Sequence, residues 1–179
     1  MWPFDSRKER ARRKLLQPFS RYLSPAMSEE LVRRPERLRP DLQQAVIPYI
    51  ILQVRDDDLA RVGRFLDQAS EAVLDAGGAI MSVMSSVVAV AFGIPVRVPD
   101  DEGIAQRDQA ITRLRSDLGP NVRAVFGCAD GLYGNVGTRR MSYQVLIPDF
   151  SVPLERLLRL EFGASAELPK ARQQETGQP

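Results

Sequence analysis

The sequence contains no histidine and a single cysteine, Cys128, among its 179 residues. Without histidine the chain lacks the commonest acid–base residue, the usual activator of a nucleophile and the commonest metal ligand. A single cysteine cannot form an internal disulfide, which suits a reducing cytoplasm, and we expect Cys128 to be a small buried residue and not a nucleophile. These absences exclude histidine-dependent catalysis and a disulfide-stabilised fold.

Long apolar runs are also missing. The most apolar stretch, residues 79–98, is interrupted by serine, glycine and proline, so it suits strands better than a membrane span. Residues 1–16 lack the continuous apolar segment of a signal peptide, so we expect a cytoplasmic protein. With 44% hydrophobic residues, the chain is long enough for one domain with a core plus tails.

The net charge is only +2, but it is distributed unevenly. Residues 1–40 hold 11 Lys/Arg against 5 Asp/Glu, and the remaining residues hold 14 against 18. The basic arm, residues 1–21, predicts contact with an anionic membrane surface, the inner face of the membrane. The alternative is that these residues form a solvated helix face without a partner. We do not expect nucleic-acid binding, because interleaved aromatic residues and a reader motif are missing.

The order of periodic segments predicts an α+β fold. Apolar or alternating runs predict strands at residues 49–54, 79–84, 87–92, 122–126 and 142–147. Helical spacing predicts helices at residues 26–33, 59–76, 100–118 and 154–160. The resulting order predicts a ferredoxin-like βαββαβ sheet with the two long helices on one face. We divide the chain into a basic helical segment with a connector (1–44), a globular domain (45–166) and a disordered polar tail (167–179).

The helices are predicted together with their caps and inner faces. Ser24 and Asp58 are the expected N-caps. The inner face of the first long helix is expected to carry Leu59, Val62, Leu66, Ala69 and Val73, with Phe65 and Ala72 beside them. The second long helix is expected to bury Ile104, Ile111, Leu114 and Leu118.

Residues 122–149 combine two strands with a glycine-rich connection. Its glycines, which allow positive φ or close backbone approach, are Gly127, Gly131, Gly134 and Gly137. Such a loop can cradle phosphate with its backbone N–H groups. It matches neither G-x-G-x-x-G nor the Walker pattern, however, and a structural turn is the simpler interpretation.

The residues after these glycines carry a family resemblance. The run G-N-V-G, T-R-R-M, S-Y-Q-V from Gly134 resembles the signature of class III adenylate and guanylate cyclases. Residues 19–25, F-S-R-Y-L-S-P, are similar to the segment that precedes the catalytic domain in bacterial members. A-G-G at residues 76–78 and F-G-I-P at residues 92–95 match two further family positions. The resemblance covers roughly residues 10–160 and implies a cyclase-like sheet, shortened relative to the family.

The resemblance also implies a reaction in which two aspartates hold two metal ions while the ribose 3′-oxygen attacks the α-phosphate. These aspartates map to Val54 and Ser86, neither of which can replace an anionic ligand of Mg²⁺ or Mn²⁺. A shift of two residues would instead place Asp56 at the first metal position, with Asp57 or Asp58 beside it. Acidic residues at a helix start are also expected as caps. We therefore expect no catalytic residue and no bound metal, with Asp56 as a weak candidate ligand.

The family residues that read the base and stabilise the transition state are largely replaced. The lysine maps to Ser82, the histidine maps near Gly127 or Cys128, and the asparagine maps to Val152. What the resemblance leaves is a remnant nucleotide-binding set: Gly134, Asn135, Gly137, Arg140, Asp149 and Arg156.

These departures predict a catalytically inactive cyclase-homology domain that acts as a dimerising scaffold or regulatory partner in signalling. The family works as dimers with active sites between protomers, so the expected partner is a second copy or another cyclase-type domain. One alternative is an active adenylate or guanylate cyclase, or half of a heterodimeric one, which would need Mg²⁺ or Mn²⁺. Another is a sensor that binds nucleotide without turnover.

Overall fold

The computed structural model describes residues 14, 22–34, 42–135, 143–146 and 150–169. Its helices are α2 (Pro25–Arg33), α3 (Leu59–Asp75), α4 (Asp100–Leu118) and α5 (Ser151–Arg159), with a 3₁₀ turn, η3, at Gly119–Asn121. Its strands are β1 (Gln43–Val54), β2 (Gly78–Met84), β3 (Val87–Phe92), β4 (Val122–Asn135), β5 (Tyr143–Leu146) and β6 (Ser165–Glu167). The predicted α+β class and the order of the predicted elements are confirmed, and β6 is a strand that was not predicted.

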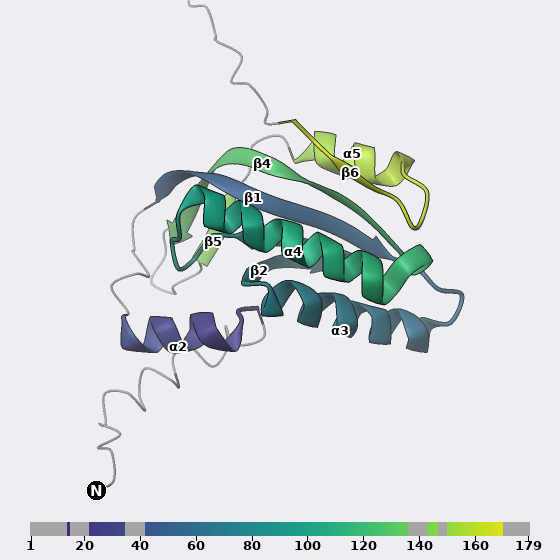
Figure 1. Cartoon of the computed structure of the whole chain (residues 1–179), viewed down its shortest axis with the longest axis horizontal. Helices are drawn as coiled ribbons and strands as arrows, with labels where there is room; N and C mark the ends of the chain where they lie inside the picture. Colours follow the sequence, from purple (N-terminus) through teal and green to yellow (C-terminus); the bar gives the residue numbers. More distant parts are fainter. Residues whose placement is uncertain (1–13, 15–21, 35–41, 136–142, 147–149, 170–179) are drawn as a thin grey trace, which may run out of the picture.

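The strands form one sheet in the order β2-β3-β1-β4-β5, and β6 pairs with β4 as well (Figure 1). The central strand β1 pairs antiparallel with both neighbours, so that Ile50 lies opposite Val90 of β3 and Phe126 of β4. β5 is antiparallel to β4, whereas β6 is parallel to it. The sheet therefore has the strand order of a ferredoxin-like unit, extended beyond β4.

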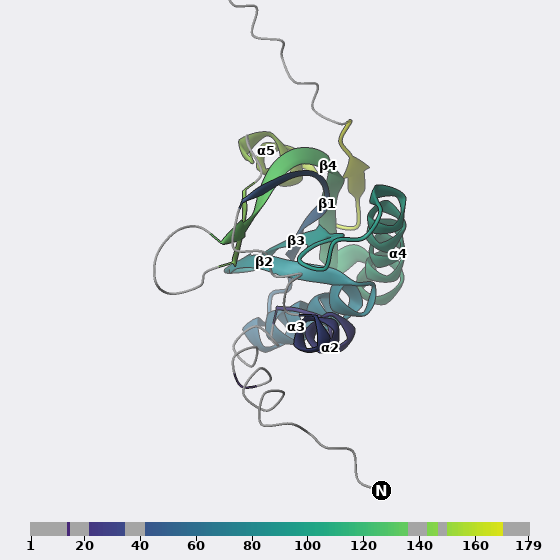
Figure 2. The ribbon, with the colours of Figure 1, turned by 90° about the vertical axis from the view of Figure 1, so that its left-hand side faces the viewer.

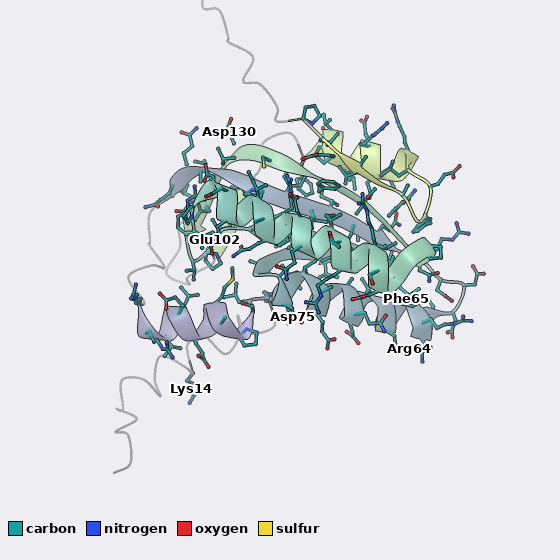
Figure 3. The ribbon with its side chains drawn as sticks, viewed as in Figure 1. Lys14, Arg64, Phe65, Asp75, Glu102 and Asp130 are labelled. Carbon is teal, nitrogen blue, oxygen red and sulfur yellow. The ribbon has the colours of Figure 1, made fainter. Side chains whose placement is uncertain are left out.

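Helices α3 and α4 cover one face of the sheet, as predicted (Figure 2). Their buried side chains meet Ile50, Leu52 and Phe92 in the largest apolar cluster, and all three of these side chains are fully buried. At the rim of this layer Asp75 of α3, labelled in Figure 3, accepts hydrogen bonds of 3.2 Å from Arg113 of α4. The apolar spacing of the two helices thus creates the main core.

Helix α5 lies on the opposite face. Its Leu157 is fully buried against Tyr49, Ile51 and Val125, which alternate along β1 and β4 with the side chains that face α3 and α4. The sheet is therefore apolar on both faces, which explains why the central run of β1 is continuously hydrophobic.

Helix α2 packs at the β2 edge of the sheet. Ser24 is its N-cap, as predicted, and its side-chain oxygen accepts a hydrogen bond of 3.1 Å from the Met27 backbone N–H. Met27 and Leu31 bury their side chains against Ala79 of β2. The Ile80 backbone N–H also donates to the Tyr22 carbonyl over 2.8 Å. Helix α2 is thus attached to the sheet by apolar packing and by backbone pairing.

Two strands are longer than predicted. β1 begins at Gln43 and not at residue 49, and β4 continues through its glycines to Asn135 and not only to residue 126. β1 pairs with β4 along its whole length, from Gln43 opposite Tyr133 to Val54 opposite Val122. Pro48 lies outside the stretch of β1 that pairs with β3, so its missing N–H removes no bond to that strand. Long-range pairing thus overrides the local turn signals of proline and glycine.

Several predictions about helices and the C-terminal region were wrong. Leu59 lies in the exposed first turn of α3 and is 87% exposed. α5 begins at Ser151, three residues before the predicted start at residue 154. Glu167 belongs to β6 and not to a disordered tail, because it pairs with the edge of β4. The ends of the predicted last strand, Ser142 and Ile147, lie outside the described residues, as do residues 170–179.

Candidate functional site

Val54 and Ser86 lie side by side at the end of the sheet where β1 meets the β2–β3 turn. The Val54 backbone N–H donates to the Ser86 carbonyl over 3.0 Å, and Ser85 turns the chain with a φ of 55°. The Val54 side chain is 1% exposed and belongs to the apolar cluster under α3 and α4. The structure thus brings together the two positions to which the metal aspartates map, and one side chain there faces the core.

A polar network occupies the α5 side of the same sheet end. Gln53 donates a hydrogen bond of 3.2 Å to the Ser86 hydroxyl and accepts two from Arg123 of β4, at 2.9 Å from Nε and 2.6 Å from Nη2. The other terminal nitrogen of Arg123 donates to the carbonyls of Leu158 and Leu160, at 3.1 and 2.7 Å. These bonds connect the β2–β3 turn, β1, β4 and the C-terminal end of α5.

Arg123 shares an aromatic ring with a second arginine. The guanidinium carbon of Arg123 lies 4.5 Å from the Phe162 ring centroid, and that of Arg55 lies 5.5 Å from it. Partial burial lowers the pKa of Arg123, and the nearby charge of Arg55 lowers that pKa further. No carboxylate of the described residues forms a salt bridge with either arginine. The two arginines therefore place positive charge around the Phe162 ring.

Two of the acidic residues after β1 accept backbone hydrogen bonds at the start of α3. Asp58 is the N-cap of α3, as predicted, and accepts a hydrogen bond of 2.9 Å from the Ala60 N–H. Asp56 accepts one of 2.9 Å from the Asp58 N–H, and Arg61 lies 3.3 Å from its carboxylate. In the described part of the chain, no three His, Cys, Asp or Glu side chains gather in a way that could hold a metal ion. Two carboxylates that accept backbone hydrogen bonds and contact Arg61, next to Val54 and Ser86, do not fit a two-metal site.

The predicted nucleotide-binding residues are only partly described. Gly134 and Asn135 are the last two residues of β4, and Gly134 has a φ of 140°. Arg156 is an exposed residue of α5. Gly137, Arg140 and Asp149 lie outside the described residues. Their use in nucleotide binding stays a prediction.

The positions of the missing family residues vary in exposure. Ser82 is half-buried on β2, and Val152, at the start of α5, is 53% exposed. Cys128 of β4 is half-buried and not fully buried as predicted. The terminal nitrogen Nη1 of Arg107 lies 3.5 Å from its sulfur. Arg107 itself is only 4% exposed. A buried arginine thus lies where sequence reasoning expected an apolar contact.

Sequence reasoning missed Gln53, Arg107 and Arg123. Both Gln53 and Arg123 alternate with apolar neighbours in segments predicted as strands, and a polar residue at such a position indicates a hydrogen-bonded partner. Arg107 could not be found in this way, because a single arginine on a helix is ordinarily exposed. The basic arm lies almost entirely outside the described residues, and none of the described helices is long and apolar enough to span a membrane.

Comparison with known sequences identifies no relative. No protein-family model matches the chain, and no curated protein matches it.

Comparison with solved structures, in contrast, gives a consistent answer. The adenylyl cyclase CyaB from P. aeruginosa superposes with a TM-score of 0.57 at 17% identity, over 71% of this chain and 78% of that one. A bacterial light-regulated adenylyl cyclase gives 0.56 at 12% identity, over 87% and 52% of the two chains. The dimeric guanylyl cyclase domain of the RhoGC fusion protein from the aquatic fungus Blastocladiella emersonii gives 0.53 at 10% identity, over 72% and 82%. The chain therefore has the fold of the class III adenylyl and guanylyl cyclase catalytic domains.

Proposed function

We propose that this protein is a catalytically inactive cyclase-like domain that works by binding a partner domain. The observation that carries the proposal is the pairing of Val54 with Ser86 at the end of β1. Neither side chain carries a charge at neutral pH, so neither can hold a divalent cation of the kind that cyclisation requires. The pair stands where the family resemblance maps the two metal-binding aspartates.

The neighbourhood of this pair supports the same conclusion. The guanidinium of Arg123 donates to the Gln53 side-chain oxygen and to the Leu158 carbonyl of α5, and the Gln53 amide donates to the Ser86 hydroxyl. Of the acidic side chains that follow β1, Asp58 caps helix α3, Asp56 accepts a hydrogen bond from the Asp58 N–H, and both contact Arg61. A metal ion at Asp56 would have to displace an N–H donor and an arginine, which makes the carboxylate a poor ligand.

The fold supports a dimeric mode of action. One protein with this fold is a dimeric guanylyl cyclase domain, and its superposition covers 72% of the present chain. We propose that the chain associates with itself or with another cyclase-type domain and regulates that partner. The basic arm, residues 1–21, would add weak attraction to an anionic membrane surface.

An activity assay tests the proposal directly. The purified full chain is incubated with ATP or GTP and Mn²⁺, and cyclic nucleotide is measured. We expect none. Product formed by the chain alone would overturn the proposal. Asp56→Asn would then show whether this carboxylate holds the metal, with Asp67→Asn, which changes an exposed carboxylate of α3, as the control.

A sedimentation experiment tests the binding role. We expect the full chain to form dimers whose fraction rises with concentration, or to form a stable complex when mixed with an active cyclase domain. A chain that stays monomeric and leaves the activity of every added cyclase domain unchanged would contradict the scaffold role.

The second candidate, a nucleotide sensor without turnover, is favoured by the positive charge of Arg55 and Arg123 beside Phe162. Nucleoside triphosphate at millimolar concentration would then raise the melting temperature. The scaffold proposal expects no such rise.

Binding of the full chain to anionic vesicles at low and high salt tests whether the basic arm contacts a membrane surface. Binding that salt does not weaken would argue against an electrostatic contact.

A further inference from the structure

Three arginines hold the segment that follows α5. Arg123 of β4 donates to the carbonyls of Leu158 and Leu160 and stacks on Phe162. Arg115 of α4 donates from Nε to the Ser165 hydroxyl over 2.8 Å. Arg107 of α4 donates to the Glu167 carboxylate over 3.2 Å. The three side chains thus contact the segment at successive points along its length.

The same segment lies along β4 through its backbone. The Gly163 N–H donates to the Val122 carbonyl over 2.7 Å, and the Ala124 N–H donates to the Ala164 carbonyl over 3.2 Å. The Leu168 N–H donates to the Phe126 carbonyl over 2.8 Å. Figure 1 shows this segment, in yellow, running beside the end of β4 that leaves η3. Its backbone contacts are therefore those of a short edge strand.

Residues 161–169, which we call the strap, have little buried surface. Every strap residue is exposed or half-buried, and none is buried. In β1, by contrast, Ile47, Ile50 and Ile51 are all 0% exposed. The Glu167 side chain that Arg107 contacts is 61% exposed. Segments with few buried apolar contacts and exposed hydrogen bonds are the ones that open locally.

We propose that the strap opens as a unit while the rest of the domain stays folded, and that its arginine contacts set how often it does so. When open, the strap uncovers the outer edge of β4 and the groups beneath it. Opening breaks the contact between Glu167 and the Arg107 guanidinium, which itself lies 3.5 Å from the sulfur of Cys128. The strap is therefore a conformational gate over one edge of the sheet.

Gly127 shows how closely the closed strap fits. A Cβ atom at this position would lie 3.0 Å from the Leu168 carbonyl oxygen and 3.1 Å from the Tyr49 hydroxyl. Since Tyr49 is 3% exposed and packs under α5, the strap is the more easily displaced of the two. The methyl group that Gly127→Ala adds would thus collide with the closed strap and favour its open state.

Hydrogen exchange on the full chain tests the proposal. We expect the amides of Gly163, Leu168 and Ala124 to exchange faster than those of Ile50 and Ile51. Glu167→Gln removes the ionic contact with Arg107 and should speed strap exchange about two- to fivefold, while leaving β1 unchanged. Glu155→Gln is the matched control, because Glu155 of α5 is an equally exposed carboxylate, 3.8 Å from Arg159. In Glu155→Gln the strap amides should exchange at the same rate as in the parent chain.

The single cysteine supplies a second measurement. Cys128 is the only thiol in the chain, so its alkylation by maleimide, followed by intact mass, reports one site. Gly127→Ala and Glu167→Gln should both raise the alkylation rate without changing the exchange of β1 amides. The proposal is overturned if strap and β1 amides exchange at one common rate, or if both variants leave strap exchange and alkylation unchanged.

Discussion

The two faces of the central sheet are covered in different ways. Under α3 and α4 the contacts are apolar, and Phe92, Leu114 and Val73 are at most 1% exposed. On the other face α5 contributes one fully buried leucine, Leu157, and the chain beyond it is held largely by arginine side chains. Both faces therefore bury apolar area, and the second depends in addition on the positions of individual hydrogen bonds.

The difference between the two faces bears on the candidate functional site. The positions to which the metal aspartates map lie where the two kinds of contact meet, since Val54 belongs to the apolar core and Ser86 to the Gln53–Arg123 network. Both contacts contribute to stability, and neither supplies a charge for a cation. The substitutions below compare the two faces, from the largest expected effect to the smallest.

Phe92→Ala should be the most damaging change. The Phe92 side chain is fully buried under α3 and α4, and its removal leaves a cavity costing about 3–5 kcal/mol. Urea unfolding followed by circular dichroism measures the loss. Leu59→Ala is the control, since Leu59 is 87% exposed and should change stability by less than about 0.5 kcal/mol. Similar losses for both variants would contradict the description of the α3–α4 core.

A buried tyrosine on the α5 face should make the stability of the protein depend on pH in the alkaline range. Burial, followed by the neighbouring Cys128, raises the pKa of Tyr49 from 10.0 to about 12. The folded state therefore keeps the proton more tightly than the unfolded state does. This contribution is complete below pH 10 and is lost as the pH rises through 12, for a total of about 2–3 kcal/mol.

Comparing the parent chain with Tyr49→Phe isolates this effect, because the variant has no phenol at residue 49. Stability measured by urea unfolding across this range should fall more steeply for the parent. Parallel curves would show that the Tyr49 phenol ionises equally easily in both states.

Arg123→Met should cost about 2 kcal/mol, since it leaves the Gln53 oxygen and the carbonyls at the end of α5 without their charged donor. Arg64→Met, on the exposed surface of α3, is the matched control and should be nearly neutral. The same unfolding measurement serves both. An equal effect of the two substitutions would mean that the α5 side is held by apolar packing alone.

Asp58→Ala should have the smallest effect, about 1 kcal/mol, because it removes the N-cap of α3. Asp58→Asn, which can still cap the helix, should cost less. Melting temperatures with and without Mn²⁺ test the competing role in metal binding. If Mn²⁺ stabilises the parent chain but not Asp58→Ala, the carboxylate is a ligand as well as a cap.

The sequence by itself determined the features that depend on neighbours along the chain. Helical spacing predicted α3 and α4, with all three buried residues of α3 and three of the six buried residues of α4. Ser24 and Asp58 were identified as caps, because cap signals depend only on residues within one turn. The strand pattern and the family resemblance predicted the cyclase-like sheet and placed Val54 and Ser86 at the candidate site.

Only the tertiary structure decided which distant groups meet. The full lengths of β1 and β4 follow from their mutual pairing, which outweighs the local effects of Pro48 and the glycines. The burial of Arg107 and the contacts of Arg123 depend on residues more than thirty positions away, such as Leu158 and Glu167. Local periodicity carries no information about such partners, because a hydrogen bond across the fold is fixed by strand register and helix placement.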